Sequence, residues 1–216
     1  MDTAILKVDA QHPAPEAIRF AAEAIRRGEL VAFPTETVYG LAADALNPVA
    51  VARVCEVKGR PADNPLPVQV AGVDRLWGVA AEIPEIAFEL ARRFMPGPLT
   101  IVLRSRSELP ESVTAGTGTV GIRVPAHPVA LALLRAARTP IVAPSANPSG
   151  QPPPLNAEEV HAYLGGRIGC ILDAGESPLG VASTVIDLTA DSPMILRDGS
   201  LSRDELLEFL GQARGR

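Results

Sequence analysis

The 216-residue sequence predicts an α/β or α+β fold, in which helices pack on a twisted, mixed and open β-sheet. Helical and strand-like hydrophobic patterns alternate along the chain. Hydrophobic residues make up 47% of the chain and charged residues 21%, so a sizeable core can form without disulfides or metals. Because no repeat or linker interrupts the pattern, we expect a single domain over residues 1–216, with its core at about 12–211.

Apolar stripes and helix-end signals predict the helices. In the first stripe, the apolar residues between Ile18 and Ile25 share one face, and Gly28 follows as a C-terminal stop. Asn47 and Ser202 stand where a side chain can cap a first turn. The predicted helices cover residues 15–27, 47–58, 83–94, 128–137, 156–164 and 202–211.

Short apolar runs bounded by Pro, Gly or polar residues predict the strands. The run from Leu30 to Phe33, for example, is ended by Pro34. The predicted strands cover residues 30–33, 68–70, 99–103, 119–124, 141–143, 171–172, 184–188 and 194–196.

The charge balance limits the ligands that the chain can bind. It carries 20 Lys and Arg against 25 Asp and Glu, a formal net charge of −5, which argues against a broadly basic protein that coats nucleic acid. An aromatic content of 4% argues against a platform for stacked RNA bases. An anionic ligand must therefore be met by a few placed cations rather than by the overall field.

The cysteines and the N-terminus indicate the compartment. Cys55 and Cys170 lie among aliphatic residues and form no CxxC pair, so we expect two reduced, buried thiols and no zinc or other metal site. The N-terminal stretch lacks a basic region followed by a long apolar run, and no apolar run approaches the length of a membrane span. We therefore expect a cytoplasmic protein without a membrane partner.

Several familiar motifs are missing. Residues 116–121 match GxGxxG, but the strand before and the helix after that a dinucleotide site requires are not predicted there. No P-loop, GxSxG or HExxH pattern occurs. His127 lies in a Pro-Ala-His-Pro turn, where we expect it to hydrogen-bond its own loop. An enzyme with this sequence would work by positioning substrates and neutralising charge.

Four polar clusters, each beside an apolar strand, remain as candidates for a site: residues 33–41, 58–66, 144–150 and 180–185. Taken alone, each can be explained as turn or cap residues. Lys58 and Arg60 can meet phosphate oxygens, and Ser145 and Asn147 would point the same way on an extended segment. The joint occurrence of the clusters favours a ligand site.

The segments FPTETVYGL, KGRPADNPL, GPLT, TVGIRVPAHP, APSANPSG and STVID resemble the YrdC-like family in order and spacing, over residues 12–211 or so. The resemblance implies an open, twisted sheet around a concave cationic cavity, in the short, single-domain form. It also implies formation of L-threonylcarbamoyladenylate from L-threonine, bicarbonate and ATP, with release of pyrophosphate. A separate complex would then transfer the threonylcarbamoyl group to a tRNA adenosine next to the anticodon.

Matching positions imply the site residues. Lys58 and Arg60 would be the catalytic cations, with ATP as substrate and Mg²⁺ as its companion. The nucleotide-binding positions are Lys58, Arg60, Asn64, Thr119, Ser145, Asn147 and Arg197. The threonine-binding positions are Thr35, Thr37, Arg123, Ala143 and Ser183. Gln69 is a departure, since longer relatives often carry His there.

Two alternatives stay open. One is a non-catalytic RNA-binding module of the same fold. A weak contact with tRNA is also possible for the enzyme that the resemblance implies. The other is a carbamoyl-transfer enzyme of hydrogenase maturation, whose multidomain form carries cysteine-rich zinc motifs. Two cysteines in 216 residues do not supply those motifs.

Overall fold

The structure is a computed structural model that describes residues 2–61 and 63–214, so residues 1, 62, 215 and 216 of the predicted domain lie outside the described residues. Within them, ten strands form one mixed sheet in the order β1-β8-β2-β3-β7-β4-β6-β5-β9-β10. The strands are β1 (Ala4–Lys7), β2 (Val31–Phe33), β3 (Gly40–Asp44), β4 (Val68–Gln69), β5 (Leu99–Arg104), β6 (Thr119–Arg123), β7 (Ile141–Val142), β8 (Cys170–Asp173), β9 (Thr184–Asp187) and β10 (Met194–Arg197).

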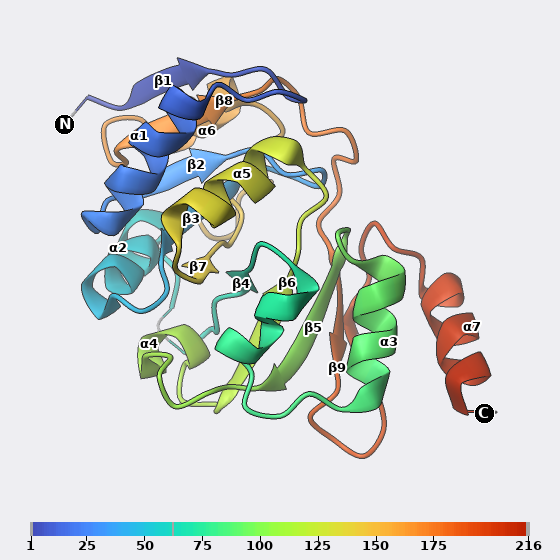
Figure 1. Cartoon of the computed structure of the whole chain (residues 1–216). Coiled ribbons are helices and arrows are strands. Elements are labelled where there is room, and N and C mark those ends of the chain that lie inside the picture. Colours follow the sequence, from blue (N-terminus) through green and yellow to red (C-terminus); the bar gives the residue numbers. More distant parts are fainter. Residues whose placement is uncertain (1, 62, 215–216) are drawn as a thin grey trace.

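The helices cover the two halves of this sheet differently (Figure 1). The half made of β1, β8, β2, β3 and β7 has α1 and α5 on one face and α2 and α6 on the other. The other half has α3 and α7 packed against one face only. The helices are α1 (Pro15–Arg26), α2 (Pro48–Lys58), α3 (Glu85–Phe94), α4 (Glu111–Thr114), α5 (Pro128–Ala137), α6 (Ala157–Leu164), α7 (Arg203–Arg214) and a 3-10 turn, η1 (Val73–Gly78).

Burial along the strands follows from this difference. In β2, which has helices on both sides, Val31, Ala32 and Phe33 are all fully buried. In β5, Leu99, Ile101 and Leu103 face the core, whereas Thr100 and Val102 face the opposite side. Alternate residues of β6 and β9 do the same. The uncovered face of this half-sheet is therefore the place where a ligand can reach the strands.

The predicted helices and strands are all present, and end signals explain their starts. Asn47 Oδ1 accepts hydrogen bonds from the backbone N–H groups of Val49 (3.1 Å) and Ala50 (3.2 Å), at the start of α2. Ser202 Oγ accepts one from Glu205 N, at 3.2 Å. The elements that sequence analysis missed are β1, β3, α4 and η1. β3 has the sequence GLAAD, which lacks β-branched residues, and it is a strand because β2 and β7 pair with it on both sides.

The GxGxxG match, the two cysteines and the helix lengths were also subjects of sequence expectations. Gly116 and Gly118 lie in a turn after the four-residue α4, and strand β6 follows, so GxGxxG has neither the strand before nor the helix after. Both cysteines are unbridged. Cys170 is buried, which raises the pKa of its thiol to about 12, but Cys55 is half-buried rather than buried as expected. Among the described residues, no helix has the length and apolar character needed to cross a membrane.

We predict that Ile101→Ala destabilises the protein by about 2–5 kcal/mol, because it leaves a cavity between the sheet and α3. Val102→Ala should cost less than half as much, since Val102 is half-buried on the uncovered face. Urea unfolding monitored by circular dichroism measures both. Equal losses would contradict the one-sided covering of this half-sheet.

Candidate functional site

A cavity of about 460 Å³ lies on the uncovered face of the half-sheet. Its floor contains one row of residues across neighbouring strands. The strand registers place Gln69 beside Arg123, and Val185 beside both Thr100 and Arg197. Four side chains of this row are polar or charged: Gln69, Arg123, Thr100 and Arg197. Strands of a sheet hold such side chains in fixed positions, as a binding site requires.

The four polar clusters converge on this floor and form its walls. Of the predicted site residues, ten line the cavity: Thr35, Thr37, Arg60, Asn64, Thr119, Arg123, Ala143, Ser145, Ser183 and Arg197. They come from segments up to 162 positions apart in the chain (Thr35 to Arg197), and the sheet brings them together. Lys58 and Asn147 lie behind the wall instead.

Lys58 fixes the shape of the loop that carries Ser145. Its Nζ donates hydrogen bonds to the carbonyl oxygens of Ser145 (2.5 Å) and Asn147 (2.6 Å), and its own carbonyl accepts one from Ser149 N at 2.7 Å. Burial, and secondly the charge of Arg60, lower the pKa of Lys58 to about 8. The ammonium is therefore a buried cation directly behind the cavity wall.

Asn147 also acts within this loop. Its Nδ2 donates to the carbonyl oxygens of Pro148 (2.9 Å) and Gln151 (2.7 Å). Ser145 pairs with Gly40 in an isolated bridge, but the chain bends at residues 146–147. The expectation that Ser145 and Asn147 share a direction is wrong for this reason, since it assumed an extended segment.

Arg60 lines the cavity and is held by its own loop. Its Nη2 donates to Asn64 Oδ1 (2.7 Å) and to the Pro65 carbonyl (2.8 Å), and Nε donates to the Asn64 carbonyl (3.1 Å). Burial lowers its pKa from the ordinary value, although a guanidinium stays charged at neutral pH. No carboxylate of the described residues is paired with it.

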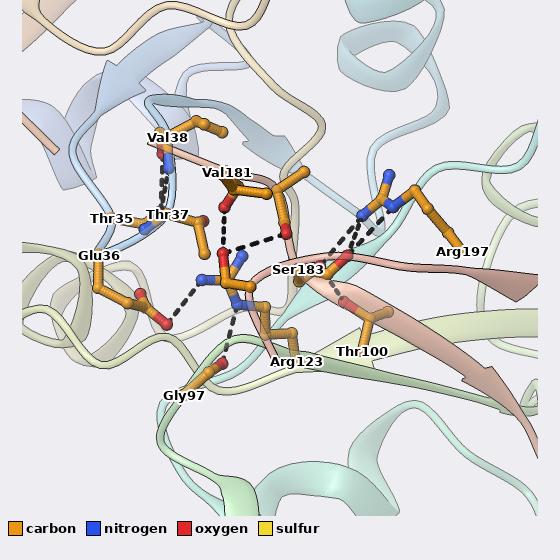
Figure 2. A network of polar contacts seen from close by, with 12 residues as sticks. Thr35, Glu36, Thr37, Val38, Gly97, Thr100, Arg123, Val181, Ser183 and Arg197 are labelled. Atoms are coloured by element: carbon orange, nitrogen blue, oxygen red, sulfur yellow. Dashed lines mark hydrogen bonds and ion pairs between the residues drawn. The ribbon is translucent and has the colours of Figure 1, made fainter. Parts of the chain in front are cut away.

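Arg123 forms a buried ion pair with Glu36, as Figure 2 shows. Its Nη2 lies 2.7 Å from Glu36 Oε1, and the two side chains are only 7% and 9% exposed. Arg123 Nε donates to the Gly97 carbonyl at 3.1 Å. The contact with Glu36 is an ion pair without hydrogen-bond geometry, and Glu36 Oε2 is buried without a partner among the described residues.

Glu36 was not among the predicted site residues. It stands between Thr35 and Thr37, which bond to each other through their hydroxyls at 2.9 Å and line the cavity. Thr35 and Thr37 were interpreted as possible turn residues. The carboxylate between them was the available signal of a charged group at the site. Because Arg123 is 87 residues further along, its pairing with Glu36 could not be predicted from spacing.

Arg197 closes the other end of the floor row. Its Nε and Nη2 donate to the Ser183 carbonyl, at 3.1 and 2.8 Å, and Nη2 also donates to Ser183 Oγ at 3.1 Å. Ser183 Oγ lies 2.8 Å from Thr100 Oγ1. Burial lowers the pKa of Arg197, and the charges of Arg123 and Arg60 lower it further. Arg197 thus lies close enough to the other two guanidiniums for their charges to affect it.

His127 lies at the start of α5. His127 caps α5, where its Nδ1 accepts a hydrogen bond from Val129 N at 3.2 Å, so the expected loop role is confirmed. Burial lowers its pKa, against the opposing charge of Glu36. The described residues contain no cluster of three or more His, Cys, Asp or Glu side chains that could hold a metal ion.

The open half-sheet defines an α/β protein whose cavity is lined by three guanidiniums beside small hydroxyl-bearing residues. The model of the Sua5/YciO/YrdC family, described as "Telomere recombination", matches residues 23–199, and the chain belongs to this family. The resemblance noted from the sequence is therefore confirmed.

Relatives support this assignment. The chain is 52% identical over 197 residues to a threonylcarbamoyl-AMP synthase of Pyrococcus abyssi (strain GE5 / Orsay), covering 91% of this chain and 58% of that protein. It is 48% identical over 192 residues to the threonylcarbamoyl-AMP synthase of Bacillus subtilis (strain 168), covering 88% and 56%. The chain thus spans less than two thirds of the length of these relatives.

Solved structures confirm the fold. Sua5 of P. abyssi complexed with L-threonine superposes with a TM-score of 0.94 at 50% identity, covering 97% of this chain and 61% of that one. YciO of E. coli gives a TM-score of 0.84 at 28% identity, covering 91% and 96%. The predicted mixed, open and twisted sheet with packed helices is therefore confirmed.

We predict that the stability of the protein rises between pH 8 and pH 10.5 through Lys58. Below pH 8 the amine is protonated in both the folded and the unfolded state, and folding carries the cost of a buried ammonium. Between pH 8 and 10.5 only the unfolded state still holds the proton, so the folded state gains.

The measurement is the difference in unfolding free energy between wild type and Lys58→Met, at pH 7.5 and at pH 10. Wild type should gain on the order of 2–3 kcal/mol relative to the variant. The only other lysine, exposed Lys7, provides the control, because Lys7→Met should show no such change. A flat difference would mean that Lys58 keeps an ordinary pKa.

We also predict that Arg123→Met destabilises the protein by about 3–5 kcal/mol at pH 7, because the buried Glu36 carboxylate loses its counter-ion. Arg197→Met should cost less than half of this, since the Ser183 carbonyl loses a donor whereas the Ser183 hydroxyl keeps Thr100 as a partner. Urea unfolding compares the two variants. A smaller loss for Arg123→Met than for Arg197→Met would contradict the pairing.

Proposed function

We propose that this protein is an L-threonylcarbamoyladenylate synthase, which joins L-threonine, bicarbonate and ATP and releases pyrophosphate. The observation that carries the proposal is the convergence of four distant loops on one cavity that holds three guanidiniums beside hydroxyl-bearing residues. The names of the P. abyssi and B. subtilis relatives, and the L-threonine in the P. abyssi complex, support the choice of substrates.

In this proposal L-threonine occupies the end of the cavity near Arg123. A guanidinium matches the fork of a carboxylate, and Arg123 is held in place by the Gly97 carbonyl and by Glu36. The other predicted threonine-binding residues, Thr35, Thr37, Ala143 and Ser183, also line the cavity, and Ser183 links this end to Arg197. They offer both hydroxyl groups and a small apolar surface, which suits a side chain with one hydroxyl and one methyl group.

ATP occupies the rest of the cavity, with its phosphates at Arg60, Ser145 and Arg197. Asn64 and Thr119 line the same region. Lys58 and Asn147 support this end from behind, and the Lys58 ammonium adds positive charge to the field at Ser145. Because the described residues form no metal-binding cluster, we expect Mg²⁺ to be carried by the triphosphate.

The proposed chemistry has two steps. The neutral amine of threonine takes up bicarbonate or CO₂ to give a carbamate, with loss of water in the bicarbonate case and of a proton to solvent in the CO₂ case. A carbamate oxygen then attacks the α-phosphorus, the bond to pyrophosphate breaks, and the bonding electrons leave with pyrophosphate. Arg60, Lys58 and Arg197 neutralise the charge that develops on the phosphates. Alignment of three substrates supplies much of the acceleration.

We further propose that the product passes to a separate complex that modifies tRNA, and that the protein works in the cytoplasm. The net negative charge and the low aromatic content of the chain argue against a dedicated RNA-binding role. Any direct contact with tRNA is therefore expected to be weak.

The test is incubation of the protein with ATP, bicarbonate and a panel of amino acids, with detection of pyrophosphate and, by mass spectrometry, of the adenylate. We expect both products with L-threonine. Arg60→Ala should lower the rate about 100-fold or more, because a charge-neutralising donor is lost. Arg75→Ala, an exposed arginine outside the cavity, is the matched control and should leave the rate unchanged.

Unaltered pyrophosphate release in both Lys58→Ala and Arg60→Ala would overturn the proposed roles of these cations. Dependence on carbamoyl phosphate in place of threonine would favour a carbamoyl-transfer enzyme. Salt-sensitive RNA binding without threonine-dependent use of ATP would favour an RNA-binding module.

A further inference from the structure

Asp187 is an unexpected member of the cavity lining. Among the described residues it is the one carboxylate that lines a cavity otherwise marked by three guanidiniums. It follows Val185 on the same face of β9, one side-chain repeat or about 6.6 Å further along the strand than the floor row. A carboxylate repels phosphate, so its position requires another explanation.

Local structure accounts for only one of its oxygens. Asp187 Oδ1 accepts hydrogen bonds from Thr189 N at 2.8 Å and from Thr189 Oγ1 at 2.7 Å, which fixes the side chain in a turn. Oδ2 has no hydrogen bond, and the carboxylate has no ion pair, within the part of the chain that the structure describes. Arg197, on the adjacent strand β10, donates to Ser183 instead.

The cavity lining around Asp187 is apolar. Val102 and Val185 are half-buried and Leu196 is 51% exposed, and all three line the cavity. Gly121, paired with Val102, carries no side chain, and an added Cβ would lie 3.1 Å from Thr100 Cγ2. An apolar patch inside a charged cavity suits the apolar face of a ring.

We propose that Asp187 accepts a hydrogen bond from the nucleoside half of ATP, whose base lies on the patch of Val102, Val185 and Leu196. The inference rests on the proposed function. The donor is a ribose hydroxyl or the exocyclic amine of adenine, the two kinds of neutral donor that a nucleoside offers to a carboxylate. Asp187 is a positioning residue, since it directs the nucleoside to its own end and the phosphates to the guanidiniums.

Calorimetric titration with ATP, 2′-deoxy-ATP, 3′-deoxy-ATP and purine riboside triphosphate, which lacks the amine, tests this. For wild type, one of the three analogues should bind about tenfold to hundredfold more weakly than ATP, and its identity names the donor. Asp187→Asn keeps an oxygen for Thr189 but loses the anionic acceptor, and should weaken ATP binding by a similar factor. The variant should not distinguish ATP from that analogue.

L-Threonine affinity is the internal control and should not change in Asp187→Asn, because Asp187 lies away from Arg123. Thr189→Val, which removes only the hydroxyl that orients Asp187, should give a smaller loss of ATP binding. The analogue series uses wild-type protein, so it remains decisive if the variant folds poorly.

Equal binding of all four nucleotides by wild type would overturn the proposal. So would a loss in Asp187→Asn that disappears when EDTA replaces Mg²⁺, because the carboxylate would then act on a metal ion. If wild type binds ATP with the predicted analogue discrimination but forms no adenylate, the proposed function fails while the role of Asp187 stands. If adenylate forms without discrimination, only the role of Asp187 fails.

Discussion

Half of the sheet has helices on one face only, and the cavity depends on this asymmetry. On β5 the side chains of Leu99, Ile101 and Leu103 pack toward α3, so that Thr100 and Val102 must face away from the core. The same constraint applies to β6 and β9. The other half of the sheet has helices on both faces, and its strand β2 is buried along its whole length. Only the uncovered face can present side chains from rigid strands to a ligand.

The positive charge of the cavity is kept available by the way it is held. Arg60 and Arg197 are fixed by carbonyl, amide and hydroxyl oxygens, which orient a guanidinium without neutralising it. Lys58 likewise donates to two carbonyls. The lowered pKa values of these three groups show the cost of placing them together in partly buried positions. Binding of an anion would relieve the repulsion between these cations, which is why the arrangement suits the triphosphate of the proposed function.

Sequence predicted what local chemistry determines and missed what the tertiary fold determines. The caps at Asn47 and Ser202 mark helix starts because the hydrogen bonds are made within one turn. Six of the ten predicted residues that line the cavity lie in polar clusters that were visible in the sequence. The family resemblance implied the other four, which are Thr119, Arg123, Ala143 and Arg197. The position of Lys58 behind the wall, the bend at Asn147 and the ion pair of Glu36 depend on contacts between distant segments, and no local pattern specifies them. The short strand β3 was missed for the same reason.

The difference between Arg123 and the other two arginines fits the proposed substrates. Arg123 alone is paired with a carboxylate, Glu36, so its end of the cavity is close to neutral. An amino acid carries opposite charges on adjacent groups and gains little from a strong field, whereas a triphosphate needs unneutralised cations. A neutral end also separates threonine from the phosphate site, because ATP would bind most strongly where Arg60 and Arg197 remain unpaired. In the proposed function, this charge pattern would give each substrate its own end of one cavity and would orient both toward the same reacting phosphorus.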